Sequence, residues 1–207
     1  MKKIVLFDFD GVIADTFDIC YDIVAGTHRS LTKDEFRGFF EGNIYEAEEK
    51  LIKEGKFPNE EEFFAKYTPQ VLEMRPIEGI PEVLEKLKEA YQLVVVSSTI
   101  TSPIQRYLEK YDLVRHLDWI MGGDVHKSKT VKIKMVLAKY KVKPEDCVII
   151  TDTLGDAKEA AKCNVKSIGV TWGYHERERL EKGDFFALVD EVEDLAPAIQ
   201  AFFNKNL

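Results

Sequence analysis

Residues 4–12 read IVLFDFDGV, a short apolar run that ends in two acids and a glycine. Its four leading apolar residues are too few for a helix and stop at acids and a glycine, a pattern typical of a buried strand. Asp8 and Asp10 follow two positions apart, so their side chains are expected on the same side of the chain. A carboxylate at the end of a buried strand is costly without a cation or hydrogen-bond donors. Because ligands of open α/β sheets bind at the carboxyl ends of the strands, the acid pair indicates a site there.

Three more apolar runs rich in β-branched residues have the length of buried parallel strands. In the segments between the runs, apolar residues recur with the spacing of a helix. Strands that alternate with helices predict an α/β fold with a Rossmann-like, doubly wound parallel sheet. The three runs are residues 93–96, 148–150 and 167–170, with weaker strand candidates at 119–121 and 185–189.

About 85 residues separate the first two strong strands, far more than a connection within such a sheet needs. Residues 16–77 contain no convincing strand, so we predict a small α-helical cap domain inserted into a core of residues 1–15 and 78–207. Helices are expected in it near 16–28, 32–42, 44–55 and 59–74, with hinges at 15–16 and 77–81. The residues that favour these bounds are Thr32 and Asn59 as N-caps, Gly55 as a stop, and Gly79 with Pro81 at the return to the core.

The composition of the 207 residues, 45% hydrophobic and 32% charged, is that of an ordinary globular protein. A net charge of −8 argues against nucleic acid as a partner, because its backbone is itself negative. No segment approaches the roughly 20 apolar residues of a membrane span, and no signal peptide is evident, so no membrane association is expected. The three cysteines, Cys20, Cys147 and Cys163, form no CxxC pair and are expected to be reduced and buried, which favours a cytoplasmic protein.

Three later stretches also bring polar groups to the predicted sheet edge. VVVSST, residues 94–99, delivers Ser97 after a strand, although a serine there is often only the N-cap of the next helix. HKSKTVKIK, residues 126–134, supplies lysines that could equally form a solvated helix face. VIITDTLGD, residues 148–156, runs from a strand into Asp152 and Asp156.

The order of these groups resembles the four sequence motifs of the haloacid-dehalogenase-like superfamily, and the resemblance covers nearly the whole chain. Asp8, Asp10 and Gly11 match the first motif, which is DxDG followed by an apolar residue. Asp152 and Asp156 match the fourth motif in its form with two acids separated by three residues.

The other two motifs are matched less completely. Ser97 corresponds to the hydroxyl of the second motif. The lysine of the third motif is either Lys127 or Lys129, and the proline that often follows it is absent. We favour Lys129, because it follows a small residue as in many relatives. Thr151 also stands where the fourth motif usually has a glycine.

The resemblance implies a magnesium-dependent phosphatase that forms an aspartyl-phosphate on Asp8, with Asp10 as the general acid and base. The implied Mg²⁺ ligands are Asp8, Asp10 through its carbonyl, Asp152 and Asp156. The implied phosphate-binding groups are Gly11, Ser97, Ser98 and Lys129. Magnesium suits such an all-oxygen site, and a cation lets an anionic carboxylate approach a phosphate dianion.

The same resemblance points to the phosphoglycolate-phosphatase-like branch, which has a helical cap after the first motif. The acid at Asp10 favours phosphatases and phosphomutases over dehalogenases, which lack an acid at that position. A small phosphate ester is therefore the expected partner, and a monomer or homodimer the expected assembly. A sugar phosphomutase similar to beta-phosphoglucomutase stays an alternative, as does a degenerate relative that only binds a phosphate ligand.

Residues that could read the rest of a substrate are harder to identify. Polar cap residues face either the cleft or solvent, with solvent the commoner outcome: His28, Arg29, Asn43, Tyr45 and Arg75. Near the C-terminus an aromatic plug, or a substrate-side wall, is expected from Trp172, Tyr174 and His175. The four histidines are widely separated, so no zinc cluster is expected.

Overall fold

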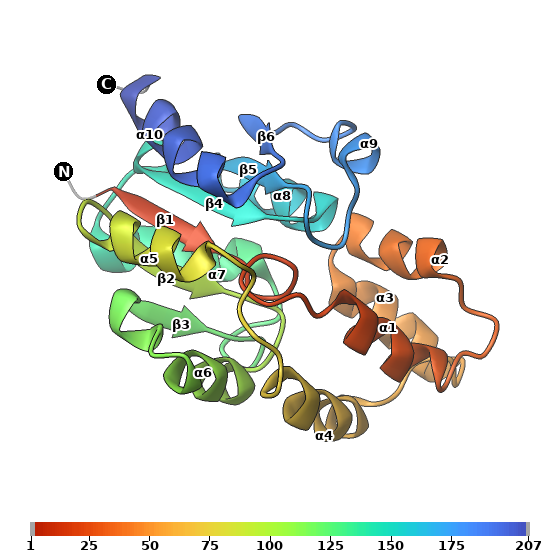
Figure 1. Cartoon of the computed structure of the whole chain (residues 1–207). Coiled ribbons are helices and arrows are strands. Elements are labelled where there is room, and N and C mark those ends of the chain that lie inside the picture. The colour runs from red at the N-terminus through yellow and green to blue at the C-terminus, as the bar shows by residue number, and fades with distance from the viewer. Residues whose placement is uncertain (1–2, 206–207) are drawn as a thin grey trace.

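The computed structural model describes residues 3–205 as a six-stranded sheet flanked by helices (Figure 1). Every neighbouring pair of strands is parallel, in the order β3-β2-β1-β4-β5-β6. The strands are β1 Ile4–Phe7, β2 Gln92–Val96, β3 Trp119–Met121, β4 Cys147–Thr151, β5 Lys166–Val170 and β6 Ala187–Val189. The predicted α/β fold with a doubly wound parallel sheet is confirmed.

The helices cover both faces of this sheet and the space beyond its carboxyl edge. The helices between the strands and at the C-terminal end are α5 Ile80–Lys88, α6 Thr101–Lys110, α7 Lys129–Tyr140, α8 Leu154–Ala161, α9 Arg177–Leu180 and α10 Leu195–Lys205. The helices between β1 and α5 are α1 Phe17–Ala25, α2 Lys33–Gly38, α3 Ile44–Lys53 and α4 Glu60–Val71. Single 3₁₀ turns are η1 Phe39–Glu41, η2 Val114–His116, η3 Pro144–Asp146 and η4 Val192–Asp194.

The alternation of side chains along β1 explains why helices are needed on both faces. Val5 and Phe7 belong to an apolar cluster with residues of α5, α6 and α10. Ile4 and Leu6 point the other way, into a cluster with residues of α7 and α8. All four are fully buried, as expected of a strand in a parallel sheet covered by helices on both faces.

Helices α1–α4, which we call the insertion (residues 17–71), lie beyond the carboxyl ends of the strands (Figure 1). The chain leaves and re-enters the sheet region side by side, through a bridge between Ala14 and Pro76. The Ile77 amide also donates to the Ile13 carbonyl at 3.0 Å. The insertion therefore joins the sheet through one narrow neck, directly above the ends of the strands.

Local chemistry sets the helix bounds of the insertion where the sequence indicated it. Thr32 and Asn59 both form capping boxes, with Glu35 and Glu62 as the partners. Gly55 has φ +69 just after α3, the left-handed conformation that ends many helices.

Some predicted bounds were too long. The stretch 32–42 splits into α2 and the turn η1, which glycines flank on both sides. Helix α1 ends at Ala25 rather than near 28, and α4 ends at Val71 rather than near 74, each followed by turns. The last strand starts at Ala187 rather than 185, and the Phe185 ring lies against Gly169.

The cysteines and the lengths of the apolar helices can be described for residues 3–205. Cys20, Cys147 and Cys163 are free and buried, as predicted. Within residues 3–205, no helix combines the length and the apolar character that crossing a bilayer requires.

Candidate active site

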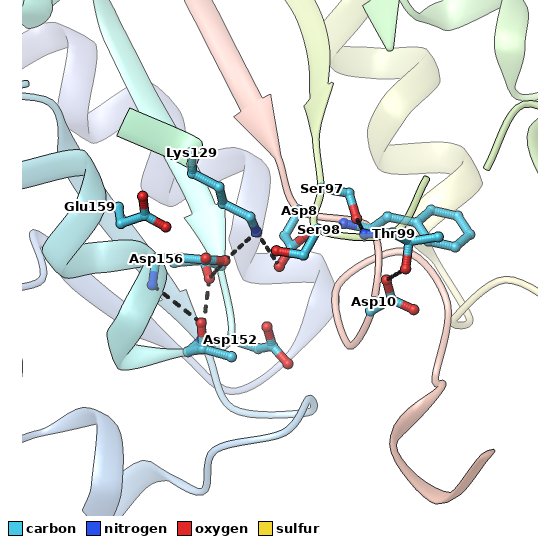
Figure 2. A network of polar contacts seen from close by, with 12 residues as sticks. Asp8, Asp10, Ser97, Ser98, Thr99, Lys129, Asp152, Asp156 and Glu159 are labelled. Carbon is cyan, nitrogen blue, oxygen red and sulfur yellow. Dashed lines mark hydrogen bonds and ion pairs between the residues drawn. The ribbon is translucent and has the colours of Figure 1, made fainter. Parts of the chain in front are cut away.

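A buried ion cluster lies where β1 and β4 end. Lys129, the first residue of α7, places Nζ 2.7 Å from Oδ2 of Asp8 and 2.5 Å from Oδ2 of Asp156 (Figure 2). The Asp8 amide continues the strand pairing by donating to the Ile150 carbonyl at 3.0 Å. Thr151 adds a hydroxyl that donates to Asp156 at 2.8 Å. The parallel register thus brings residues 8, 129 and 156 within hydrogen-bonding distance.

The charges in this cluster are strongly coupled. Burial raises the pKa of Asp8 well above its ordinary value, although Lys129 opposes the shift. Burial would also raise the pKa of Asp156, but the charge of Lys129 and hydrogen bonds to the carboxylate lower it overall. Burial would lower the pKa of Lys129, whereas Asp156 and Asp8 raise it. Asp156 is therefore the natural ionic partner of the lysine, and Asp8 is the carboxylate that lacks enough positive charge nearby.

Asp152, directly after β4, is the third carboxylate of the cluster, and one of its oxygens has no hydrogen-bond partner. Its Oδ2 accepts the Tyr174 amide at 2.7 Å, while its buried Oδ1 has no hydrogen-bond partner. Burial raises its pKa to about 7. Glycine is required opposite it, since a Cβ on Gly11 would lie 2.0 Å from Asp152 Oδ2.

These observations fit a divalent cation. Asp8, Asp152 and Asp156 are three buried acids around one lysine, which leaves two negative charges to balance. A cation beside Asp8 and Asp152 would restore the ionised form of both acids and fill the orphaned oxygen of Asp152. Over residues 3–205, no three His, Cys, Asp or Glu side chains form a complete metal site on their own.

Asp10 is held by three hydroxyl groups from three separate elements. Thr16 donates to Oδ1 at 2.8 Å, and Tyr67 of α4 donates to the same oxygen at 2.5 Å. Thr99, after β2, donates to Oδ2 at 2.7 Å (Figure 2). Burial raises the pKa of Tyr67 well above its ordinary value, so its hydroxyl stays a donor. The insertion therefore helps to orient a carboxylate of the first motif.

The loop after β2 is fixed by a second buried lysine. The Ser97 hydroxyl accepts the Thr99 amide at 3.0 Å, and the Ser97 carbonyl accepts Lys132 Nζ at 2.5 Å. Lys132 also donates to the Gly122 carbonyl at 3.3 Å, and burial lowers its pKa to about 8. The Ser98 carbonyl accepts the Tyr45 hydroxyl at 2.5 Å. Lys132 thus ties the loop after β2 to the loop after β3.

Lys127 occupies a different place from Lys129. Its Nζ lies 5.0 Å from the centre of the Tyr45 ring, and the side chain is exposed. Of the two lysines, Lys129 is the one within hydrogen-bonding distance of Asp8.

A cavity of about 540 Å³ opens between the ion cluster and the insertion. Its floor includes Asp8, Asp10, Lys129, Asp152 and Asp156. Among the polar residues singled out in the predicted cap domain, Asn43 and Tyr45 line the cavity. Arg29 and Arg75 are exposed and lie outside the lining, as does the half-buried His28.

The aromatic segment near the C-terminus lies partly at the cavity and partly in the protein interior. Tyr174 lines the cavity and its hydroxyl lies 3.1 Å from that of Thr16. His175 is fully buried, accepts the Leu154 amide at 3.2 Å and contacts the Arg37 carbonyl at 3.0 Å. Trp172 is half-buried outside the cavity lining.

Residues 5–170 match the family described as haloacid dehalogenase-like hydrolase. The chain belongs to this family. The match spans β1 to β5 and contains all the residues of the ion cluster, so the family resemblance read from the motifs is confirmed.

Similar proteins of comparable length are phosphatases by name. The chain is 26% identical over 218 residues to "Probable phosphatase IndB" of Dickeya dadantii, covering 97% of this chain and 95% of that one. It is 24% identical over 226 residues to the phosphoglycolate phosphatase of Psychrobacter arcticus, covering 95% and 98%.

Solved structures of haloacid dehalogenase-like proteins share the fold. A "predicted phosphatase" from Clostridium acetobutylicum superimposes with a TM-score of 0.80 at 23% identity, covering 97% of this chain and 99% of that one. The haloacid dehalogenase-like family protein SP0104 from Streptococcus pneumoniae gives 0.77 at 21% identity, covering 96% and 99%.

Sequence reasoning missed four residues that shape the site of this haloacid dehalogenase-like hydrolase. Thr16 and Tyr67 come from the neck and from α4, and no local pattern connects them with Asp10. Thr99 lies within the quoted serine-rich stretch, so its hydroxyl could have been considered. Lys132 lies three residues after Lys129 and so on the same side of α7, which could have marked it as buried.

Proposed function

We propose that this chain is a magnesium-dependent phosphatase that hydrolyses a small phosphorylated metabolite through an aspartyl-phosphate on Asp8. The observation that carries the proposal is the buried cluster of Asp8, Lys129 and Asp156, which faces a cavity. Beside this cluster, Oδ1 of Asp152 is buried without a hydrogen-bond partner. Relatives named as phosphatases over nearly the whole chain support the same reaction class.

The residues that would hold Mg²⁺ are the carboxylates of Asp8 and Asp152 and the backbone carbonyl of Asp10. Asp156 already accepts hydrogen bonds from Lys129 and Thr151. It would therefore stabilise the metal site from beside it rather than act as a main ligand. When bound, the ion would reduce the repulsion between the Asp8 carboxylate and the phosphate and polarise the phosphoryl oxygens.

In the first half-reaction an Asp8 oxygen forms a bond to phosphorus, and the bond from phosphorus to the ester oxygen breaks. Asp10 gives a proton to that departing oxygen, which leaves as an alcohol. The Lys129 ammonium, 2.7 Å from Asp8, balances charge on the phosphoryl group and on the carboxylate. Gly11, Ser97 and Ser98 would supply backbone and hydroxyl hydrogen bonds to the phosphoryl oxygens.

In the second half-reaction Asp10 takes a proton from a water molecule, whose oxygen attacks phosphorus. The bond from phosphorus to Asp8 breaks, which releases inorganic phosphate and restores both carboxyl groups. Hydrogen bonds from Thr16, Tyr67 and Thr99 orient Asp10 for this exchange. The insertion, as a cap over the cavity, would exclude other water and contact the leaving group.

The test is free phosphate released from a panel of phosphorylated metabolites, with Mg²⁺ or with a chelator, by the wild type and by Asp8→Asn. We expect release that requires Mg²⁺ and is lost in the variant. A phosphomutase would redistribute phosphate without releasing it, and a binding protein would do neither. Release that survives in pure Asp8→Asn protein would refute the mechanism.

A further inference from the structure

The wall that the insertion contributes to the cavity is mainly aromatic and aliphatic. Rings of α2, α3, α4 and the neighbouring turns line the space opposite the ion cluster. These residues are Phe36, Phe40, Tyr45, Phe57, Phe63 and Phe64. A wall of this kind favours an apolar leaving group, because burial of apolar surface stabilises the bound state.

The charged residues on the same wall are all acids. Among the described residues of the insertion, the lining contains four glutamates and no lysine, arginine or histidine. The glutamates are Glu46, Glu48, Glu49 and Glu60. This wall repels a negatively charged leaving group.

Glu48 is the glutamate with the strongest reason to bind a ligand. It is half-buried at the cavity, and no residue between 3 and 205 donates a hydrogen bond to it or pairs with it. Burial raises its pKa to about 7, with Lys127 opposing the shift. Glu49, in contrast, is exposed and paired with Lys53 at 2.8 Å. A partly buried carboxylate at a cavity, without a donor from the protein, is well placed to pair with a ligand cation.

Two basic side chains of the described residues line the outer cavity and would favour an anion, His126 and Lys127. The Lys127 Nζ lies above the Tyr45 ring, 5.0 Å from the centre, so its charge is already partly engaged with an aromatic face. These two exposed basic side chains face four glutamates. The net field of the outer cavity is therefore negative.

We propose, on the basis of the phosphatase function above, that the substrate is a phosphate monoester whose leaving group has an apolar body and carries an ammonium group toward Glu48. Phenylalanine and tyrosine rings next to a carboxylate attract such cations through their negative faces. The carboxylate of a phosphoglycolate-like ester would instead face the four glutamates.

The experiment compares kcat/KM for three esters in Mg²⁺: phosphocholine, 3,3-dimethylbutyl phosphate and phosphoglycolate. The first two have the same shape and differ in one positive charge. We expect phosphocholine to exceed its uncharged analogue by about tenfold, the scale of a desolvated cation–π contact, and phosphoglycolate to be the poorest. Glu48→Gln should lower kcat/KM for phosphocholine to that for the uncharged ester. The control is Glu61→Gln, which removes the same charge from an exposed position of α4 outside the cavity.

The outcomes separate this inference from the function on which it rests. Release from the uncharged ester without a preference for phosphocholine, or a preference for phosphoglycolate, would overturn the inference and leave the phosphatase intact. A preference for phosphocholine that Glu48→Gln retains, or that Glu61→Gln loses equally, would also overturn it. No release from any of these esters or from the wider panel would overturn the phosphatase itself.

Discussion

Replacement of Lys129 by methionine tests whether the buried ammonium holds the acids of the site together. The Lys129 side chain is 2% exposed, and those of Asp8 and Asp156 are 9% and 11% exposed. Methionine keeps most of the volume and removes the charge. Breaking a buried ion pair from one side costs about 3–5 kcal/mol. At about 2–4 °C per kcal/mol for a chain of this size, the melting temperature should fall by roughly 6–20 °C.

The loss should depend on pH with a defined sign. Without the ammonium, the pKa of Asp8 in the folded state rises further above its unfolded value, and the pKa of Asp156 rises because the positive charge that lowers it is gone. Stability is then lost as pH rises through those raised pKa values, and little is lost where the acids stay protonated. The difference between variant and wild type should therefore be larger at pH 8 than at pH 5.

The assay is thermal and urea unfolding in chelator at both pH values, with Lys127→Met as the matched control. The control removes an exposed lysine of the same stretch and should leave stability within about 0.5 kcal/mol. Equal melting temperatures for Lys129→Met and the wild type at pH 8, or an equal loss in Lys127→Met, would refute the assignment of the ion cluster.

Three further substitutions test other parts of the site. Tyr67→Phe removes a hydroxyl that orients Asp10, so kcat for alkyl phosphates should fall by about tenfold; Tyr107→Phe is the control, because the buried Tyr107 hydroxyl has no partner to lose, and equal kinetics in the two variants would contradict the orienting role. Because the folded pKa of Lys132 is about 8 against an ordinary 10.5, wild-type stability should gain from pH 8 to 10.5 relative to Lys132→Met; parallel stability curves for the two proteins would show that the lysine titrates normally. Asp8→Asn should abolish phosphate release yet melt no lower than the wild type in chelator at pH 7, since it removes an acid whose pKa burial raises; a lower melting temperature would mean that the ionised Asp8 stabilises the fold.

The sheet and the acids at its edge could be read from the sequence because the signals are local. A buried parallel strand is a short apolar run, and an acid directly after such a run must lie at the carboxyl edge. The capping boxes at Thr32 and Asn59 are equally local. The strand and helix types were therefore predictable, while several bounds were not, as at the start of β6.

The contact of Tyr67 with Asp10 could not be predicted, because α4 meets this carboxylate only after the insertion packs against the strands. The sequence also left both Lys127 and Lys129 open as the lysine of the third motif. The two lysines lie close in sequence, and their positions diverge only because α7 begins at Lys129. The division into core and cap domains stays a prediction, and the larger apolar cluster runs from the sheet into the insertion without a break.

The narrow neck at Ala14 and Pro76 gives the chain a modular character. Ion-cluster residues come from the segments that follow β1, β3 and β4. The aromatic wall comes from the insertion alone, and the chain segments that enter and leave the insertion are hydrogen-bond neighbours. Evolution can therefore replace the insertion by another of different length, with different residues at the cavity, without moving the carboxylates. A protein engineer has the same option, since a graft at this neck requires only two adjacent junctions. Proteins with this sheet can thus diverge in what they recognise while sharing the groups that carry out the reaction.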